Sequence, residues 1–313
     1  MELIRGLINL KPWHRGAVVS IGNYDGVHRG HQTVLRELRQ RAETFAVPAT
    51  VIVFEPTPQE FFAAAAPPAR LMRFGEKLRA LDEQGVERVL CLRFDRKLAE
   101  LSPEDFIERI LVRGLGVRYL VVGDDFRFGH ARRGDFAMLQ QAGAAHGFEV
   151  RDTGVLQVNG ERISSTRIRE ALAAGDMAHA AALLGRPFAL GGHVLYGAQL
   201  GRKLGFPTAN IALRRQVVPV RGIFAARIHG IGTDPREGVA YVGERPAVGG
   251  TSPLLEVCVF DFDGDLYGRR LRVELLQRLR DDAHFADLTA LQQQIRQDVA
   301  AARTWLAQNN QTK

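Results

Sequence analysis

Cysteine and long apolar runs are scarce in this chain, and each scarcity narrows the class of protein. The 313 residues include two cysteines, Cys91 and Cys258, which lie in separate apolar segments typical of strands. This placement favours buried thiols in a reducing compartment over a disulfide. No segment approaches the length of a membrane span, and residues 1–10 carry Glu2 and Arg5 without the apolar run of a cleavable signal. We therefore expect a cytoplasmic protein with no membrane partner.

Lysine is also rare, so the positive charge comes mainly from arginine. The formal net charge is +7 and the pI is about 9.8, yet lysine occurs at positions 11, 77, 97, 203 and 313 alone. The arginines are scattered, no block of five like charges occurs, and aromatic residues do not alternate with them, so nucleic acid is not indicated as a partner. Arginine suits forked contacts to phosphates or carboxylates. We expect small phosphorylated molecules as partners.

The length and the hydrophobic content of 46% predict two domains with sizeable cores. The first half alternates apolar strands with helices, which predicts an α/β domain with a parallel sheet covered on both faces. The expected strands are residues 17–21, 49–54, 86–94 and 119–122, and the expected helices are residues 32–43 and a segment that starts after Ser102.

The pattern changes after about residue 185, where we place a boundary between domains 1–185 and 186–313. Two helical stretches, 166–173 and 178–184, precede it. Beyond it, alternating apolar residues predict an antiparallel sheet or small β-barrel, with Asp263-Gly264 as a hairpin turn. The expected strands are residues 223–228, 239–242, 255–262 and 271–276. A C-terminal amphipathic helix should pack on the barrel through Leu288, Leu291, Ile295, Val299, Ala302 and Leu306.

Residues 21–32, IGNYDGVHRGHQ, combine a strand end, a glycine-rich turn and two histidines. Gly22 allows a sharp turn, and Gly26 and Gly30 keep side-chain bulk away from a ligand. His28 and His31 are three residues apart, so their imidazoles should point to the same side of a first helical turn. The pattern predicts a phosphate site; metal binding by the histidines and a purely structural turn are the alternatives.

Polar residues follow three of the expected parallel strands. The glycine turn follows Ile21, Glu55-Pro56 follows Phe54, and Gly123-Asp124-Asp125 follows Val122. Because ligands bind at the carboxyl ends of parallel strands, we expect the three clusters to meet at one edge of the sheet.

Several motifs carry a resemblance to known families. The segment HRGH (28–31) is similar to the His-x-Gly-His signature of the nucleotidyltransferase superfamily, and ISSTRIR (163–169) to its second phosphate motif. Together with FEPTP (54–58), GDDFRFG (123–129), GRKLGFPTAN (201–210) and LEVCVFDFDGDLYG (255–268), the pattern resembles bacterial bifunctional riboflavin kinase and FAD synthetase. The resemblance spans nearly the whole chain. It implies a Rossmann-like nucleotidyltransferase domain for FMN adenylylation followed by a riboflavin kinase barrel with a C-terminal helix.

For the first half, the resemblance implies contacts to ATP and flavin. His28 and His31 contact phosphate, and Ser165, Thr166 and Arg169 hold the β- and γ-phosphates. Further nucleotide- and flavin-binding positions are Gly22, Asn23, Asp25, Gly26, Gly30 and Asp125. Taken alone, Ser164-Ser165-Thr166 would equally suit a plain helix N-cap.

For the second half, the resemblance implies a kinase that is not of the P-loop type. Thr208 and Asn210 are ligands of Mg²⁺ and ATP phosphates, and Glu256 is the base for the riboflavin hydroxyl. Gly201 and Gly205 keep the loop close to ATP. Lys203 adds charge or is a solvated loop lysine. By itself Glu256 would be read as a surface carboxylate of a strand.

Two positions depart from the family pattern Asn-x-Gly-x-Arg-Pro-Thr, because Tyr241 and Ala247 replace the Asn and the Thr. Each change removes a hydrogen-bonding group near the expected flavin pocket. Three alternatives therefore stand beside the bifunctional enzyme. They are an FMN adenylyltransferase with an impaired kinase domain, an adenylyltransferase for another phosphorylated metabolite, and a non-catalytic flavin-binding regulator.

Overall fold

The computed structural model describes residues 1–63, 67–123, 126–154, 157–158, 160–197, 201, 205–247 and 250–309, with backbone alone at 158, 245–247 and 250–251. The chain forms two compact units. The first unit is Met1–Pro68 with Met72–Ser164, and the second is Ala69–Leu71 with Ser165–Lys313. None of the helices in the described part of the chain is both long enough and apolar enough to cross a membrane.

The first unit is built on a sheet with the strand order β1-β4-β3-β2-β5-β6, in which every neighbouring pair is parallel. Its strands are β1 (Glu2–Arg5), β2 (Ala17–Ile21), β3 (Ala49–Glu55), β4 (Arg88–Arg93), β5 (Val117–Val122) and β6 (Glu149–Asp152). The order reverses beside β2, and such a switch point is where open α/β sheets bind ligands. The predicted parallel sheet is confirmed, with β1 and β6 as edge strands that the sequence pattern did not reveal.

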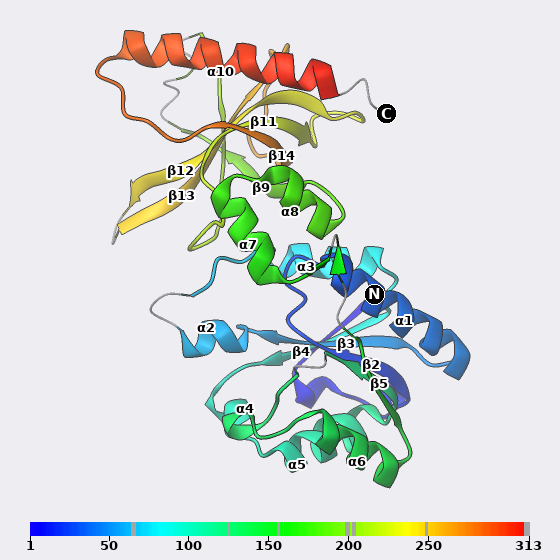
Figure 1. The fold of residues 1–313 in the computed structure, drawn as a ribbon. Helices are drawn as coiled ribbons and strands as arrows, with labels where there is room; N and C mark the ends of the chain where they lie inside the picture. The colour runs from blue at the N-terminus through cyan, green and yellow to red at the C-terminus, as the bar shows by residue number, and fades with distance from the viewer. Residues whose placement is uncertain are drawn as a thin grey trace. The chain divides into compact units, whose positions relative to one another are not determined.

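Helices cover both faces of this sheet (Figure 1). The main helices are α1 (Arg29–Phe45), α2 (Pro58–Phe62), α3 (Phe74–Glu83), α4 (Arg96–Ala99), α5 (Pro103–Phe106), the π-helix η3 (Ile107–Leu115) and α6 (Phe136–His146). On one face α1 and α3 bury Leu35, Leu38 and Leu81 against the strands. On the other face α5, η3 and α6 bury a second apolar cluster. Ser102 accepts the backbone N–H of Asp105 at 3.0 Å, which confirms the predicted helix start.

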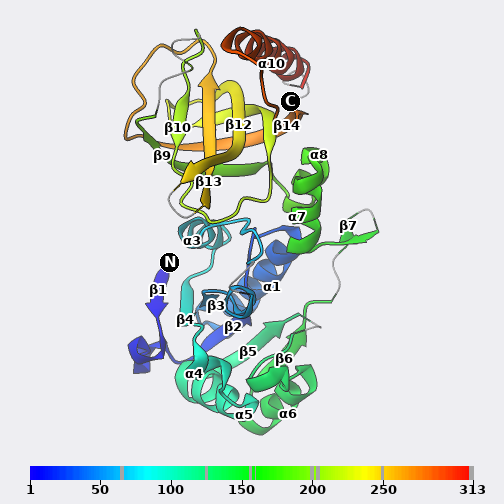
Figure 2. The ribbon, with the colours of Figure 1, turned by 90° about the vertical axis from the view of Figure 1, so that its left-hand side faces the viewer.

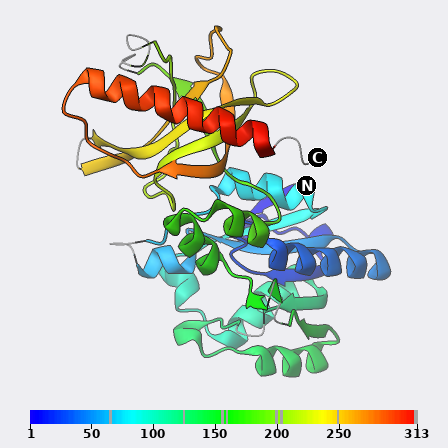
Figure 3. The ribbon, with the colours of Figure 1, turned by 45° about the horizontal axis from the view of Figure 1, so that its top comes forward.

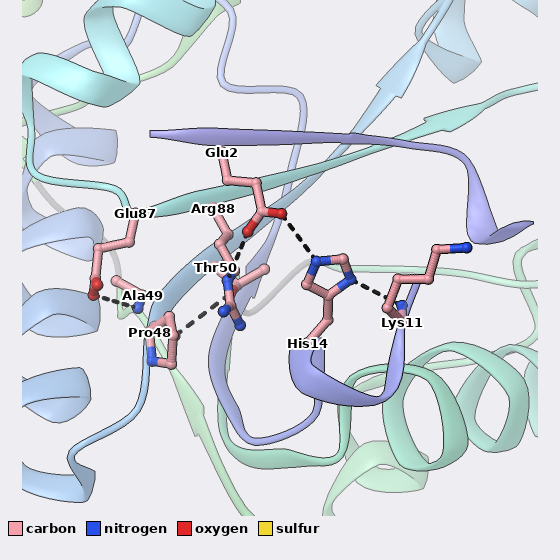
Figure 4. Close-up of polar contacts among 8 residues, drawn as sticks. All are labelled: Glu2, Lys11, His14, Pro48, Ala49, Thr50, Glu87 and Arg88. Carbon is pink, nitrogen blue, oxygen red and sulfur yellow. Dashed lines mark hydrogen bonds and ion pairs between the residues drawn. The ribbon is translucent and has the colours of Figure 1, made fainter. Parts of the chain in front are cut away.

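Short elements complete this unit. They are the 3₁₀ turns η1 (Leu7–Asn9), η2 (Pro12–His14) and η4 (His130–Arg132), and the hairpin of β7 (Gln157–Val158) and β8 (Glu161–Arg162). Polar contacts attach β1 and η2 to the sheet (Figure 4). His14 is buried, and its Nδ1 accepts the backbone N–H of Lys11 at 2.9 Å. The ring proton therefore sits on Nε2, which donates to Glu2 Oε1 at 3.0 Å, while Arg88 Nε donates to Glu2 Oε2 at 3.1 Å.

The second unit holds a closed barrel with the strand order β10-β13-β12-β11-β14-β9, in which all six pairings are antiparallel (Figure 2). Its elements are α7 (Ser165–Ala174), α8 (Met177–Leu184), β9 (Phe188–Leu195), β10 (Ala209–Ile211), β11 (Gly222–His229), β12 (Arg236–Ala247), β13 (Gly250–Val259), β14 (Arg270–Arg280) and α10 (Leu288–Asn309). Alternate residues such as Ala240, Val242, Leu255 and Val257 are fully buried and fill the barrel interior. The predicted barrel is confirmed.

The hairpin predicted at Asp263-Gly264 is wrong. Strand β13 pairs with β10 and β12, whereas β14 pairs with β11 and β9, so the two consecutive strands are not neighbours. The residues between Val259 and Arg270 form a longer connection that buries Phe260 and Leu266. Asp-Gly is suited to a tight turn, but the order of strands in the barrel decides which strands such a turn can join.

The C-terminal helix α10 lies along the outside of the barrel, as predicted (Figure 3). Its Ala302 and Leu306 pack with Ala225 of β11 and with Phe260. The predicted apolar stripe is only partly core, however, because Leu288 is 56% exposed at the start of the helix. The remaining members of the stripe, Leu291, Ile295 and Val299, line a cavity that is described below.

Candidate active sites

The glycine turn between β2 and α1 has a strained backbone. Gly26 has a φ of 89°, while Tyr24 and Val27 have φ values of 49° and 40°. A positive φ is costly for a residue with a Cβ atom and most costly for a β-branched one. The Tyr24 hydroxyl donates to Ser20 Oγ at 2.6 Å and anchors the turn to β2. Such strain is kept where the surroundings impose it, which occurs most often at ligand sites.

The two histidines lie on the same side of the first helical turn, as predicted. Their rings stack with centroids 3.6 Å apart and planes 16° from parallel. His28 is the N-cap of α1, and its Nδ1 accepts the backbone N–H of His31 at 3.3 Å. Because parallel rings do not direct two nitrogen lone pairs to one point, this geometry disfavours metal chelation by the pair.

His31 is neutral in this environment. Burial lowers its pKa well below the ordinary value, and the nearby His28 and Lys77 lower the pKa further. Its Nδ1 atom is buried and has no hydrogen-bond partner among the residues that the structure describes. Lys77 of α3 is only 1% exposed, which is unusual for a lysine. In the sequence Lys77 is distinguished only as one of few lysines; its place on an apolar helix face is the signal that could have marked it as buried.

The glycines of the turn pack against rings of the protein itself. A Cβ atom on Gly22 would lie 3.2 Å from the Tyr24 ring, and one on Gly30 would lie 3.1 Å from the His28 ring. Asp25 is buried and accepts the backbone N–H of Met72 at 3.0 Å. These contacts show how the turn is held in shape. The ligand contacts that the sequence analysis assigned to Gly22, Asn23, Asp25, Gly26 and Gly30 stay predictions.

The second phosphate motif begins helix α7. Ser165 and Thr166 are its first residues, and Arg169 lies in the next turn. Arg169 Nε donates to the backbone carbonyl of Ala69 at 2.6 Å, so part of this guanidinium holds the segment Ala69–Leu71 within the second unit. Asp125, which the resemblance assigned to the nucleotide and flavin contacts, lies outside the described residues.

A cavity of about 390 Å³ lies on the outer face of the barrel. It is bounded by outward-facing residues of β10–β13, by the connection after β14 and by α10. The strand register places five of these residues in one row across the barrel, because directly paired residues of antiparallel strands share a face. The row runs in the order Asn210, Glu256, Tyr241, Ile223 and Arg280.

One end of the row carries oxygen-bearing side chains. Asn210 pairs directly with Glu256, and Thr208 lines the same cavity. A Cβ atom on Gly201 would meet Thr208 and the Phe206 carbonyl, and one on Gly197 would meet the Asn210 amide. These glycines therefore allow the backbone to approach the two side chains closely. Gly205 has a φ of 82°, which also favours glycine. Lys203 lies outside the described residues.

The opposite wall combines an ion pair with apolar side chains that the sequence analysis did not assign to a site. Arg280 makes a bidentate pair with the buried Asp298 of α10, with both N···O distances 2.8 Å. Its guanidinium lies 5.6 Å from the centre of the Phe285 ring. Leu291, Ile295 and Val299 complete an apolar surface. No sequence motif marks these contacts, because β14 and α10 meet only in the folded barrel.

The two departures from the family pattern have different outcomes. Tyr241 lines the cavity and its hydroxyl donates to Asp282 Oδ2 at 2.8 Å, so a hydrogen-bonding group is present at this position. The side chain of Ala247 lies outside what the structure describes.

Both cysteines are free thiols, as predicted. The prediction that both are buried is confirmed for Cys91 and wrong for Cys258, which is partly exposed and lines the cavity.

Comparisons with known proteins match both units. Residues 10–167 match the family model described as FAD synthetase, and residues 184–306 match the one described as riboflavin kinase. A bifunctional riboflavin kinase/FMN adenylyltransferase of Escherichia coli K12 is 49% identical over 304 residues, which is 97% of each chain. The protein of the same description from Pseudomonas fluorescens is 51% identical over 308 residues, which is 98% of each chain.

A solved structure is also similar to this chain over nearly its whole length. It is described as a macrolide-efflux protein from Streptococcus pneumoniae, has 29% identity and a TM-score of 0.83, and the match covers 97% of this chain and 100% of that one. The FAD synthetase match includes the glycine turn, and the riboflavin kinase match includes the residues of the barrel cavity. The matches to the two relatives span nearly the whole chain. This chain therefore belongs to the family of bifunctional riboflavin kinase/FMN adenylyltransferases.

Proposed function

We propose that this chain makes FAD in two steps, each of which consumes ATP. In the first step, the hydroxyl of riboflavin attacks the γ-phosphate of ATP and yields FMN and ADP. In the second step, the FMN phosphate attacks the α-phosphate of a second ATP and yields FAD and pyrophosphate. The observation that carries the proposal is the row in the barrel cavity, where the register sets Asn210 beside Glu256 in a chain that matches a kinase family there.

In the kinase step, Glu256 accepts the proton of the riboflavin hydroxyl as a general base. Thr208 and Asn210 would hold Mg²⁺ together with ATP phosphates. Both offer oxygen atoms, which Mg²⁺ prefers, and the ion typically completes its shell with phosphate oxygens and water. The bound ion would neutralise charge on the polyphosphate during transfer. The close backbone at Gly201 and Gly197 supports this assignment, because it orients both side chains.

The apolar end of the same cavity suits the flavin. Phe285, Leu291, Ile295 and Val299 offer flat and aliphatic surface to a planar ring system, while the polar end takes the hydroxyl and the phosphates. A flavin bound in this direction extends its ribityl chain toward Glu256. The cavity volume of about 390 Å³ is within the range of small-molecule pockets.

In the adenylyl transfer step, the chemistry requires positioning and charge neutralisation rather than a covalent enzyme intermediate. His28 and His31 contact ATP phosphate from the strained turn. A neutral His31 gains a proton readily when a phosphate anion binds, because an opposite charge favours the imidazolium. Ser165, Thr166 and Arg169 at the start of α7 bind the β- and γ-phosphates, and Asp125 contributes to the nucleotide and flavin contacts.

We further propose that the functional boundary lies at residue 185. Residues 1–185 would then perform adenylyl transfer and residues 186–313 would perform the kinase reaction. The family matches support this division, since one ends at residue 167 and the other begins at residue 184. The free thiols of Cys91 and Cys258 support a reducing compartment, the cytoplasm, where ATP is available.

The alternatives are not favoured. An adenylyltransferase for another metabolite does not explain the match of residues 184–306 to a riboflavin kinase family. A kinase half without function, or a non-catalytic regulator, does not explain why Thr208, Asn210 and Glu256 line one cavity.

The purified chain, incubated with riboflavin, ATP and Mg²⁺, tests the proposal when the flavins are separated by chromatography. We expect FMN and FAD. A parallel reaction started from FMN isolates the adenylyl transfer step and should give FAD. A reaction that leaves riboflavin unchanged would contradict the kinase assignment, and one that stops at FMN would contradict the adenylyltransferase assignment.

A further inference from the structure

A hydrogen bond from strand β12 reaches the segment that follows β14 and borders the cavity. The ring of Tyr241 lies over the backbone of Gly243, where a Cβ atom would collide with it. From there its hydroxyl donates to Asp282 Oδ2 at 2.8 Å. Tyr241 belongs to β12, whereas Asp282 follows the end of β14. The bond therefore ties two parts of the second unit that are 41 residues apart in the chain.

The tied segment, residues 281–287, forms part of the cavity wall. It has no helix or strand of its own, and Asp282, Ala283 and Phe285 line the cavity. Its two ends are held by regular structure, β14 before it and α10 after it. Between them, Asp282 Oδ1 accepts the backbone N–H of Ala283 at 2.9 Å, and Phe285 lies beneath the Arg280 guanidinium. Contacts of this kind, rather than a backbone ladder, decide where the segment lies.

The phenol also separates two carboxylates. In the row across the barrel Tyr241 pairs with Glu256, and its hydroxyl points to Asp282. Burial raises the pKa of Tyr241, and the hydrogen bond to Asp282 and the charges of Asp282 and Glu256 raise the pKa further. The hydroxyl is therefore a neutral donor throughout the pH range in which proteins are folded. It donates a hydrogen bond to the Asp282 carboxylate without adding a charge beside Glu256.

We propose that Tyr241 is a positioning residue that, through Asp282, holds residues 281–287 against the cavity and thereby sets the affinity for the flavin. The proposal rests on the proposed kinase function of this cavity. The segment carries Phe285, which belongs to the apolar end, and none of the oxygen ligands of the polar end. Loosening it weakens binding of riboflavin while the transfer of phosphate from bound ATP to bound riboflavin continues.

The test compares steady-state riboflavin phosphorylation by the full chain and its Tyr241→Phe variant. We expect KM for riboflavin to rise about tenfold, which is the scale for losing a hydrogen bond to a carboxylate. We expect kcat and KM for ATP to stay within about twofold, because neither the base nor the phosphate ligands are touched. Titration of riboflavin without ATP, followed by flavin fluorescence, should show the same loss of affinity.

Variants of Asp282 test whether the two residues act together. Asp282→Ala should raise KM for riboflavin as Tyr241→Phe does. The KM of the double variant should not exceed the higher of the two KM values of the single variants. Asp282→Asn keeps an amide oxygen that accepts the phenol hydroxyl, so it should retain most of the affinity. Tyr196→Phe is the matched control, because this tyrosine is 76% exposed and does not line the cavity.

Two results would overturn the proposal. One is an unchanged KM for riboflavin in Tyr241→Phe, and the other is full additivity of the Tyr241→Phe and Asp282→Ala effects. Both are distinct from a failure of the proposed function, in which the unmodified chain itself forms no FMN. Equal thermal unfolding midpoints of the Tyr241→Phe and Tyr196→Phe variants exclude unfolding as the cause of a raised KM.

Discussion

The two candidate sites are built in opposite ways. In the first unit, the histidine pair lies in one contiguous stretch at the carboxyl end of β2, shaped by a strained backbone and by the stacking of the two rings. In the second unit, the site is a row of side chains from separate antiparallel strands, aligned by register on the outer face of a closed barrel. The contrast teaches that the residues of a turn site are neighbours in the sequence, whereas the residues of a barrel site come from strands that are far apart in the sequence.

The sharpest test of this contrast is whether each site serves one reaction. His28→Asn should reduce FAD formation from FMN by about 100-fold or more and leave FMN formation intact, because the proposed role of the imidazole is to contact the phosphates of adenylyl transfer. Glu256→Gln should reduce FMN formation by about 100-fold or more and leave FAD formation from FMN intact, because its proposed role as a base belongs to the kinase step alone. Chromatography of the flavins from both starting materials measures the two rates.

The choice of asparagine at position 28 provides a control for the fold. His28 caps α1, and Asn also caps helices, so His28→Asn keeps the helix start while it removes the imidazole. His28→Ala removes both, and the difference in stability between the two variants measures the cap. If either His28→Asn or Glu256→Gln lost both reactions while its thermal unfolding matched that of the unmodified chain, the proposed division of the two reactions between residues 1–185 and 186–313 would be wrong.

A second prediction concerns the stability of the barrel wall. Asp298→Ala leaves Arg280 without its bidentate partner in a largely buried place and should lower the free energy of unfolding by about 3 kcal/mol. Asp261→Ala is the matched control, because Asp261 pairs with Arg303 in the same bidentate geometry but both side chains are exposed to solvent. Its effect should be far smaller, because exposed pairs contribute little.

Denaturant unfolding followed by tryptophan fluorescence measures both variants. Trp305 on α10 packs against the barrel, while Trp13 is 68% exposed, so the signal reports mainly on the second unit. Equal losses from Asp298→Ala and Asp261→Ala would show that burial does not distinguish the two pairs.

The smallest expected effect is the pH dependence of the first unit. The pKa of His31 is lowered in the folded chain, so the unfolded chain binds more protons as the pH falls below about 6.5. The contribution of neutral His31 to stability is therefore complete above that pH and is lost as the pH falls. His31→Gln should flatten the acid-side decline in unfolding free energy, and the exposed His130→Gln should not. Identical pH profiles of the two variants would contradict the assignment.

Much of the fold followed from periodicity. Continuous apolar strands separated by helices predicted the parallel sheet, and alternation with short connections predicted the barrel, since both patterns reflect which faces of a strand are buried. Within the first motif, His28 and His31 lie on the same side of the helical turn as predicted, with their rings stacked. For the second site, the motifs that hold Thr208, Asn210 and Glu256 were found separately, and all three line one cavity.

What the sequence did not reveal depends on contacts between distant segments. The pair of Arg280 with Asp298 joins a strand to a helix, and neither residue stands in a recognisable motif. The Asp263-Gly264 dipeptide has the composition of a hairpin turn, but strand order places β13 and β14 apart. Periodicity described α10 as an apolar stripe, yet it could not show that Leu291 and Ile295 face a cavity while Ala302 packs directly against the outer face of the barrel.

The sequence by itself determined the two fold classes and the glycine turn with its paired histidines, because these depend on local conformation and short spacing. Only the tertiary structure decided that Glu256 lies between Asn210 and Tyr241, and that Tyr241 bonds to Asp282. The physical reason is that register and barrel closure set which side chains share a face, and these are properties of strand pairing rather than of any one segment.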